Sequence, residues 1–199
     1  MELDSRRGFL NFAALFEGGT LLLGMLLGWA TATLTPTSVR LSLVDAGWGL
    51  AAVVPLLGAI LLAPELRRRV RELLGAQIAA CSWLDLAALA CLAGLGEEIL
   101  FRGVIEPWLA RWHPWAGLIG ANLLFGLAHA ISLTYFGFAT AIGCFLSWLA
   151  WGWPGSQWPW DGPNLLRSII AHAVYDFIAF QIIAHDYRRL TATGTGTEP

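Results

Sequence analysis

The first apolar stretch of the chain, residues 12–34, reads FAALFEGGTLLLGMLLGWATATL and contains a single ionisable residue, Glu17. A helix needs about 20 predominantly apolar residues to cross the hydrocarbon core of a bilayer, so this stretch predicts a membrane span. It is too long for the apolar region of a signal peptide and lacks a convincing small-residue cleavage site. We therefore interpret it as a permanent helix, with Glu17 solvated or snorkelling near a membrane boundary.

The rest of the chain has the same character. Of its 199 residues 57% are apolar and 13% are charged, and its mean hydropathy is +0.62. A soluble domain of this size leaves about a third of its unfolded surface wet and cannot bury so much apolar area. Further spans are predicted at residues 46–63, 84–106, 115–134, 136–152 and 165–184. The sequence thus predicts one all-α integral-membrane domain over residues 1–199, a polytopic bundle of about six transmembrane helices.

Composition also excludes several functions. A net charge of −2 gives no basic surface for nucleic acid. The spans leave no room for a large extramembrane domain. Cys81, Cys91 and Cys144 stand singly in apolar stretches and indicate small buried residues rather than a disulfide or zinc framework.

Three segments lie between or after the spans. Residues 64–77 combine four arginines with apolar positions, which predicts an amphipathic helix at an anionic lipid surface. Residues 153–164 are rich in Pro, Gly and Trp and predict an interfacial loop. Residues 191–199 are polar and predict a disordered tail.

Arginine placement predicts the orientation. With six spans, Arg6 and Arg7, the 64–77 segment, and Arg188 and Arg189 fall on one side, and the opposite loops contain Arg40, Arg111 and Arg167. The positive-inside rule then places both termini in the cytoplasm. We expect an integral protein of a bacterial-type plasma membrane.

Ionisable residues inside the predicted spans are the main functional signal, because an ionised side chain at mid-membrane costs several kcal/mol unless it is paired or hydrated. They occur as Glu97-Glu98 with Arg102 in the third span, Phe125 with His129 in the fourth, and His172 with Asp176 in the sixth. Glu98 with Arg102 and His172 with Asp176 are spaced i,i+4, so each pair shares one helix face. If the three helices adjoin, Glu97, His129, His172 and Asp176 converge in one polar pocket. Glu106, by contrast, is expected near the boundary after the third span and is assigned no chemistry.

The chemistry open to such a pocket is restricted. The chain has no G-x-S-x-G, no H-E-x-x-H, no Gly-rich phosphate loop and no thiol placed beside a histidine. A carboxylate with two imidazoles can deprotonate water and pass the proton to a leaving amine. The same residue types can relay protons in a transporter, although no inverted repeat is evident.

These motifs resemble those of the CAAX protease and bacteriocin-processing family, also called the Abi family of intramembrane endopeptidases. That family is marked by E-E-x-x-x-R, F-x-x-x-H and H-x-x-x-N or H-x-x-x-D on successive membrane helices, and the resemblance covers roughly residues 84–184. It implies an endopeptidase acting at or within the membrane on a protein or peptide substrate. The family's best-known members cleave prenylated CAAX proteins, and the resemblance leaves open whether the substrate here is prenylated. Other members are linked to bacteriocin immunity, so a non-catalytic membrane scaffold is the alternative.

The resemblance also implies roles for individual residues. Glu97 would be the general base that activates water, assisted by His129, and His172 with residue 176 would stabilise the oxyanion. Glu98, Arg102 and Phe125 would support the shape of the site.

Asp176 departs from the best-known members, which have Asn there. An ionised carboxylate repels an oxyanion, so Asp176 either stays protonated or orients His172. Zinc held by Glu97, His129, His172 and Asp176 is a third reading. We favour no metal and no other cofactor.

Overall fold

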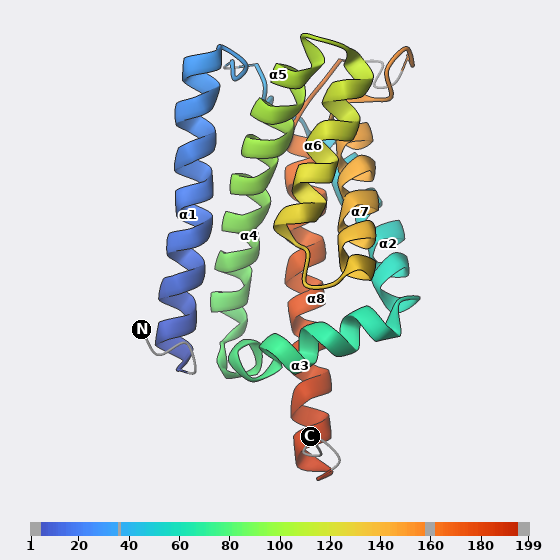
Figure 1. Ribbon diagram of the computed structural model, residues 1–199. Helices are drawn as coiled ribbons and strands as arrows, with labels where there is room; N and C mark the ends of the chain where they lie inside the picture. Colours follow the sequence, from blue (N-terminus) through green and yellow to red (C-terminus); the bar gives the residue numbers. More distant parts are fainter. Residues whose placement is uncertain (1–4, 36, 158–161, 195–199) are drawn as a thin grey trace.

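The computed structural model describes residues 5–35, 37–157 and 162–194. Within these ranges the chain is helical with no strand, which confirms the predicted all-α class. The elements are α1 (Arg6–Thr31), α2 (Leu43–Leu61), α3 (Pro64–Ala80), α4 (Trp83–Leu100), a π-helical turn η1 (Phe101–Ile105), α5 (Glu106–Ala110), α6 (Pro114–Ala128), α7 (Leu133–Trp151) and α8 (Leu166–Ala192). Figure 1 shows α3 lying across one end of a bundle formed by the other long helices.

The helices have the dimensions of a membrane bundle. By length and composition α1, α2, α7 and α8 can each cross a membrane, and α6 is a shorter apolar helix. The α4 segment includes three carboxylates, but it continues without a break through η1 into α5. The four long helices, the continuous helix formed by α4, η1 and α5, and the shorter α6 together give the six spans that the sequence predicts.

The surface of the bundle is apolar, as lipid contact requires. Trp29, Leu43 and Leu133 are each more than four-fifths exposed. The only buried residues of α1 are Gly8, Gly24 and Gly28. Small residues allow close helix approach where lipid removes the hydrophobic drive for association.

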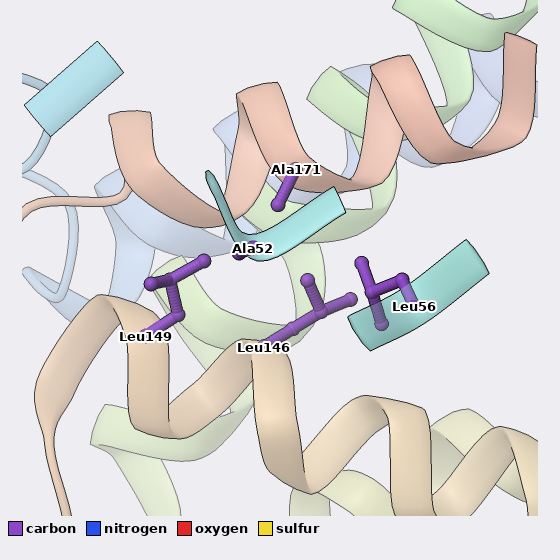
Figure 2. Close-up of a cluster of buried hydrophobic side chains, with 5 residues drawn as sticks. All are labelled: Ala52, Leu56, Leu146, Leu149 and Ala171. Carbon is purple, nitrogen blue, oxygen red and sulfur yellow. The ribbon is translucent and has the colours of Figure 1, made fainter. Parts of the chain in front are cut away.

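One apolar core cluster joins three spans. Figure 2 shows Ala52 and Leu56 of α2, Leu146 and Leu149 of α7, and Ala171 of α8 meeting in this cluster. Leu146 and Ala171 are completely inaccessible. The cluster fixes α8, which carries His172, against α2 and α7.

Helix ends follow from capping residues. Ser42, Ser82 and Ser132 each accept a hydrogen bond from a backbone N–H in the first turn of the following helix. Ser82 and Asp85 form a reciprocal capping box, and Arg6 of α1 binds the Asp85 carboxylate at 2.6 Å. These contacts tie the start of α1 to the start of α4.

The basic segment predicted at residues 64–77 forms α3, which extends to Ala80. Arg68 pairs with Glu65 and Glu72 along the exposed face of the helix, each at 2.6 Å. The Arg67 guanidinium lies 3.3 Å from the Asp186 carboxylate of α8. The placement of α3 at a lipid surface stays a prediction.

Some predicted boundaries are wrong. The fourth span ends at Ala128 rather than residue 134, because His129 caps α6 and Ser132 caps α7. Residues 191 and 192 of the predicted tail belong to α8, whose last turns continue the helix past the apolar stretch. Residues 195–199 of that tail, and residues 158–161 of the Trp-rich loop, lie outside the described residues.

The cysteines also differ from expectation. Cys81 is buried as predicted, whereas Cys144 is half-buried and Cys91 is exposed. Cys91 can remain exposed because the surrounding solvent of the bundle is lipid. Cys81 follows α3, and burial raises the pKa of its thiol.

Candidate active site

The site forms where α4 and α8 pack closely. A Cβ atom added to Gly94 would lie 2.8 Å from both the backbone nitrogen and the Cβ of Ala173. Only glycine permits this approach. It places Glu97 and Glu98, about one turn further along α4, beside His172 of α8.

Glu98 joins the two helices. Its Oε1 accepts a hydrogen bond from Arg102 Nη1 at 3.0 Å and lies 2.9 Å from His172 Nδ1. Glu98 and Arg102 are completely buried, so the predicted i,i+4 ion pair is confirmed. Because a carboxylate paired with arginine only accepts hydrogen bonds, His172 donates from Nδ1 and turns Nε2 away from Glu98.

Arg102 lies in η1, a π-helical turn of a kind often found at functional sites. Its Nη2 donates to Asn122 Oδ1 and to the carbonyl oxygen of Gly143, each at 2.9 Å. Its guanidinium carbon lies 4.4 Å from the ring centroid of Phe125. Phe125 therefore supports the site by packing on the cation, in addition to its contact with His129.

His129 enters the site from the end of α6. Its ring centroid lies 4.4 Å from that of Phe125, and its Nδ1 lies 2.9 Å from the Phe125 carbonyl oxygen. A carbonyl oxygen can only accept, so Nδ1 carries the hydrogen. In the neutral ring Nε2 is therefore a free acceptor, and it lies 3.5 Å from Glu97 Oε2.

Glu97 is buried between the two histidines. Its Oε2 lies 3.9 Å from His172 Nε2, and it has no hydrogen-bond partner among the residues that the structure describes. A buried carboxylate oxygen needs a partner to offset desolvation. The separation from His129 Nε2 suits a bridging water better than a direct bond.

Asp176 completes the group. Its Oδ2 lies 3.5 Å from His172 Nε2, as the i,i+4 spacing predicts. The structure thus brings Glu97, His129, His172 and Asp176 together, and their catalytic roles stay predictions. Around the group, Tyr135 and Tyr175 help line a cavity of about 50 Å³ that also includes both histidines and Asp176.

A larger cavity lies beside this small one. It has a volume of about 500 Å³ and shares His129 and Tyr135 with the smaller cavity. Its apolar walls come from α3, the end of α6 and the connection to α7: Val70, Leu73, Leu74, Leu127, Ala128, Ala130 and Ile131. His129 therefore lines a cavity that is walled on one side by α3.

Two acidic residues do not lie where the sequence suggested. Glu17 was expected to be solvated, yet its Oε2 is buried. A Cβ atom added to Gly96, the residue before Glu97, would lie 3.0 Å from the backbone oxygen of Glu17. Glu106 was expected at the boundary, yet it is 7% exposed and accepts a hydrogen bond from Ser147 at 2.6 Å. Each lies against a neighbouring span, which sequence position alone does not reveal.

Asn122 and Ser147 are further site residues that the motifs missed. Both are completely buried, and the one signal for them was a polar side chain within an apolar span. Both take part in the hydrogen bonding around Arg102.

Zinc held by Glu97, His129, His172 and Asp176 stays an alternative prediction. Within residues 5–35, 37–157 and 162–194, no group of three or more His, Cys, Asp or Glu side chains is arranged to hold a metal ion. His172 Nδ1 contacts Glu98, which leaves its Nε2 directed at Glu97 and Asp176.

Comparison with models of known protein families gives a match over residues 79–178 to the family described as type II CAAX prenyl endopeptidase Rce1-like. The matched segment runs from the end of α3 into α8 and contains every residue of the three motifs. No curated protein and no solved structure matches the chain.

Proposed function

This chain belongs to the Rce1-like type II CAAX prenyl endopeptidase family, and we propose that it is an integral-membrane endopeptidase in which Glu97 and His129 activate water. The observation that supports this most directly is the buried Glu97 Oε2 facing the free Nε2 of His129 at 3.5 Å, and His129 also lines the cavity walled by α3. A water placed between these atoms can donate one hydrogen to each of them.

In the proposed reaction Glu97 removes a proton as the water oxygen attacks the peptide carbonyl carbon. The resulting tetrahedral intermediate carries its negative charge on the former carbonyl oxygen. When the carbon–nitrogen bond breaks, Glu97 returns the proton to the leaving amine, and His129 orients the water throughout. Water is consumed, and one carboxyl and one amine are formed.

His172 is proposed to stabilise the oxyanion with Nε2. Because Nδ1–H is engaged by Glu98, Nε2 donates only when the ring is an imidazolium. Asp176 Oδ2, 3.5 Å from Nε2, favours that cation. This arrangement supports the reading of Asp176 as a residue that orients and charges His172, rather than as a direct oxyanion donor. The proposal uses no metal ion.

The substrate is proposed to be a membrane-anchored peptide. The larger cavity that His129 lines is walled by apolar residues of α3 and of the α6–α7 connection. Whether a prenyl group is required is decided by testing one peptide with and without it.

We also propose that both termini lie in the cytoplasm. α1 begins and α8 ends at the end of the bundle crossed by α3 (Figure 1), and these three regions contain Arg6, Arg7, the α3 arginines, Arg188 and Arg189. The positive-inside rule favours this side as cytoplasmic.

The test uses purified protein and membrane-tethered peptides, with cleavage followed by mass spectrometry. Positioned acid–base groups contribute about 10²–10⁴-fold, so we expect Glu97→Gln and His129→Ala each to lower the rate by at least about 10²-fold. Glu65→Gln, on the exposed face of α3, is the matched control and should retain the wild-type rate. Cleavage by Glu97→Gln within a few-fold of wild type would overturn the mechanism.

Two other functions are distinguished by the same variants. A non-catalytic scaffold predicts a cellular phenotype that survives both substitutions. A proton transporter predicts proton flux in liposomes that Glu97→Gln abolishes.

A further inference from the structure

The Glu98–Arg102 pair is the inner end of a longer buried chain of hydrogen bonds. From Arg102 the chain continues through Asn122 of α6 and Ser147 of α7 to Glu106 of α5. Its links measure 2.9 Å from Arg102 Nη2 to Asn122 Oδ1, 2.8 Å from Asn122 Nδ2 to Ser147 Oγ, and 2.6 Å from Ser147 Oγ to Glu106 Oε2. We call Asn122, Ser147 and Glu106 the outer chain.

Chemistry fixes the direction of every link. The Asn122 amide nitrogen donates to the Leu118 carbonyl oxygen and to Ser147 Oγ, each at 2.8 Å. Its oxygen is thereby turned toward Arg102, which can only donate. Ser147 accepts from Asn122, so its hydroxyl hydrogen is free to bind the Glu106 carboxylate. Glu106 is the final acceptor that orients the outer chain.

The outer chain holds Arg102 in one orientation. Nη1 donates to Glu98, and Nη2 donates to Asn122 and to the Gly143 carbonyl oxygen. Removing the Asn122 oxygen leaves Nη2 with one of these two acceptors. The guanidinium is then free to rotate away from Glu98, and Glu98 is the residue that accepts the Nδ1 hydrogen of His172 and so orients the ring.

We propose that Asn122, Ser147 and Glu106 are positioning residues that act through Arg102 and Glu98 to keep Nδ1 of His172 protonated and Nε2 directed at the reacting atoms. The inference rests on the proposed function, since it assigns the outer chain a part in that reaction. Asn122 and Ser147 are completely buried and Glu106 is 7% exposed, and none of the three lines either of the cavities beside His129. Glu106 instead lines a separate cavity of about 520 Å³ with Arg111 and Trp151.

The kinetic test compares two buried asparagines. Asn122→Ala removes the contact with Arg102. Asn164→Ala is the matched control, because Asn164 is 1% exposed and binds Asp45 at 2.8 Å without touching the outer chain. Small displacements of reacting groups can lower rates about 10²-fold. We therefore expect Asn122→Ala to lower kcat by about 10- to 100-fold with KM within about two-fold, and Asn164→Ala to retain kcat per folded molecule.

Glu106 provides the conservative rescue. Glu106→Gln keeps an acceptor oxygen for Ser147 and should retain most of kcat, whereas Glu106→Ala should lower it as Asn122→Ala does. Wild-type kcat in Asn122→Ala, an equal loss in Asn164→Ala, or an equal loss in both Glu106 variants would each overturn the proposal.

A second measurement is independent of catalysis. The chain has four histidines, so ¹⁵N-histidine spectra of the folded protein in detergent can be assigned with single variants. We expect Nδ1 of His172 to be protonated in the wild type and in Asn164→Ala, and its signals to shift in Asn122→Ala. If no peptide is cleaved even by the wild type, the endopeptidase proposal fails, and unchanged His172 signals in Asn122→Ala would separately refute the positioning role.

Discussion

Replacing Arg102 with methionine tests the energetic role of the buried cation. The guanidinium is completely inaccessible and donates hydrogen bonds to Glu98, Asn122 and Gly143 at 3.0, 2.9 and 2.9 Å. Removing one partner of a buried ion pair costs about 3–5 kcal/mol. Each neutral acceptor left unpaired adds about 1–3 kcal/mol, which the apolar contacts of methionine partly offset. We expect Arg102→Met to lower the free energy of unfolding by about 4 kcal/mol or more.

The assay is a double-mutant cycle measured by equilibrium unfolding in mixed micelles. Glu98→Gln alone leaves the Arg102 charge buried without its partner, and the double variant removes both charges. We expect the double variant to lose less than the sum of the single losses, with a coupling of about 1–3 kcal/mol.

Arg69→Met is the control for the loss of one positive charge. Arg69 is exposed on α3, and its replacement should change stability by less than about 0.5 kcal/mol. A loss of stability below about 1 kcal/mol in Arg102→Met would refute this reasoning. So would single-variant losses whose sum equals the loss of the double variant to within about 0.5 kcal/mol.

Three further predictions concern packing and reactivity. Gly94→Ala should separate α4 from α8, because its Cβ would lie 2.8 Å from α8 backbone. A loss of about 1–3 kcal/mol in the free energy of unfolding, and a loss of cleavage, are expected. Gly58→Ala, whose added Cβ meets nothing within 4 Å, should be neutral or stabilising in the same equilibrium unfolding assay. Leu146→Ala should cost about 2–5 kcal/mol because the side chain is completely buried, and equal stability to Leu43→Ala, on the lipid-facing surface, would contradict this. Burial raises the pKa of the Cys81 thiol, so less thiolate is present at any given pH. Iodoacetamide should therefore alkylate Cys81 more slowly in the folded than in the SDS-denatured protein, as measured by peptide mapping. The alkylation rate of the folded protein should rise from pH 7 to 9.

Local patterns in the sequence predicted several features of the site. Glu98 with Arg102 and His172 with Asp176 lie four residues apart, and helical geometry alone places each pair on one face. Ionised groups are costly in lipid, so the ionisable residues inside apolar stretches identified the spans that carry the site. The same reasoning failed for Glu17, because its position near the start of the predicted span says nothing about which neighbour covers it.

Contacts between helices required the folded structure. Glu98 was predicted to brace its own helix, yet its Oε1 also contacts His172 Nδ1 at 2.9 Å. Asn122 and Ser147 are single polar residues in apolar spans, and no spacing rule connects residues 25 positions apart. The tautomer of His172 follows from these contacts and could not be read from the motifs.

The sequence by itself determined that this chain is a helical membrane protein and which spans carry ionisable groups, because hydropathy and i,i+4 spacing are properties of consecutive residues. The tertiary structure alone decided which oxygen faces which imidazole nitrogen, how Arg102 is held, and where the cavities open. Those features depend on angles and distances between helices, which are set by close contacts such as Gly94 against Ala173 and by the packing of all spans together.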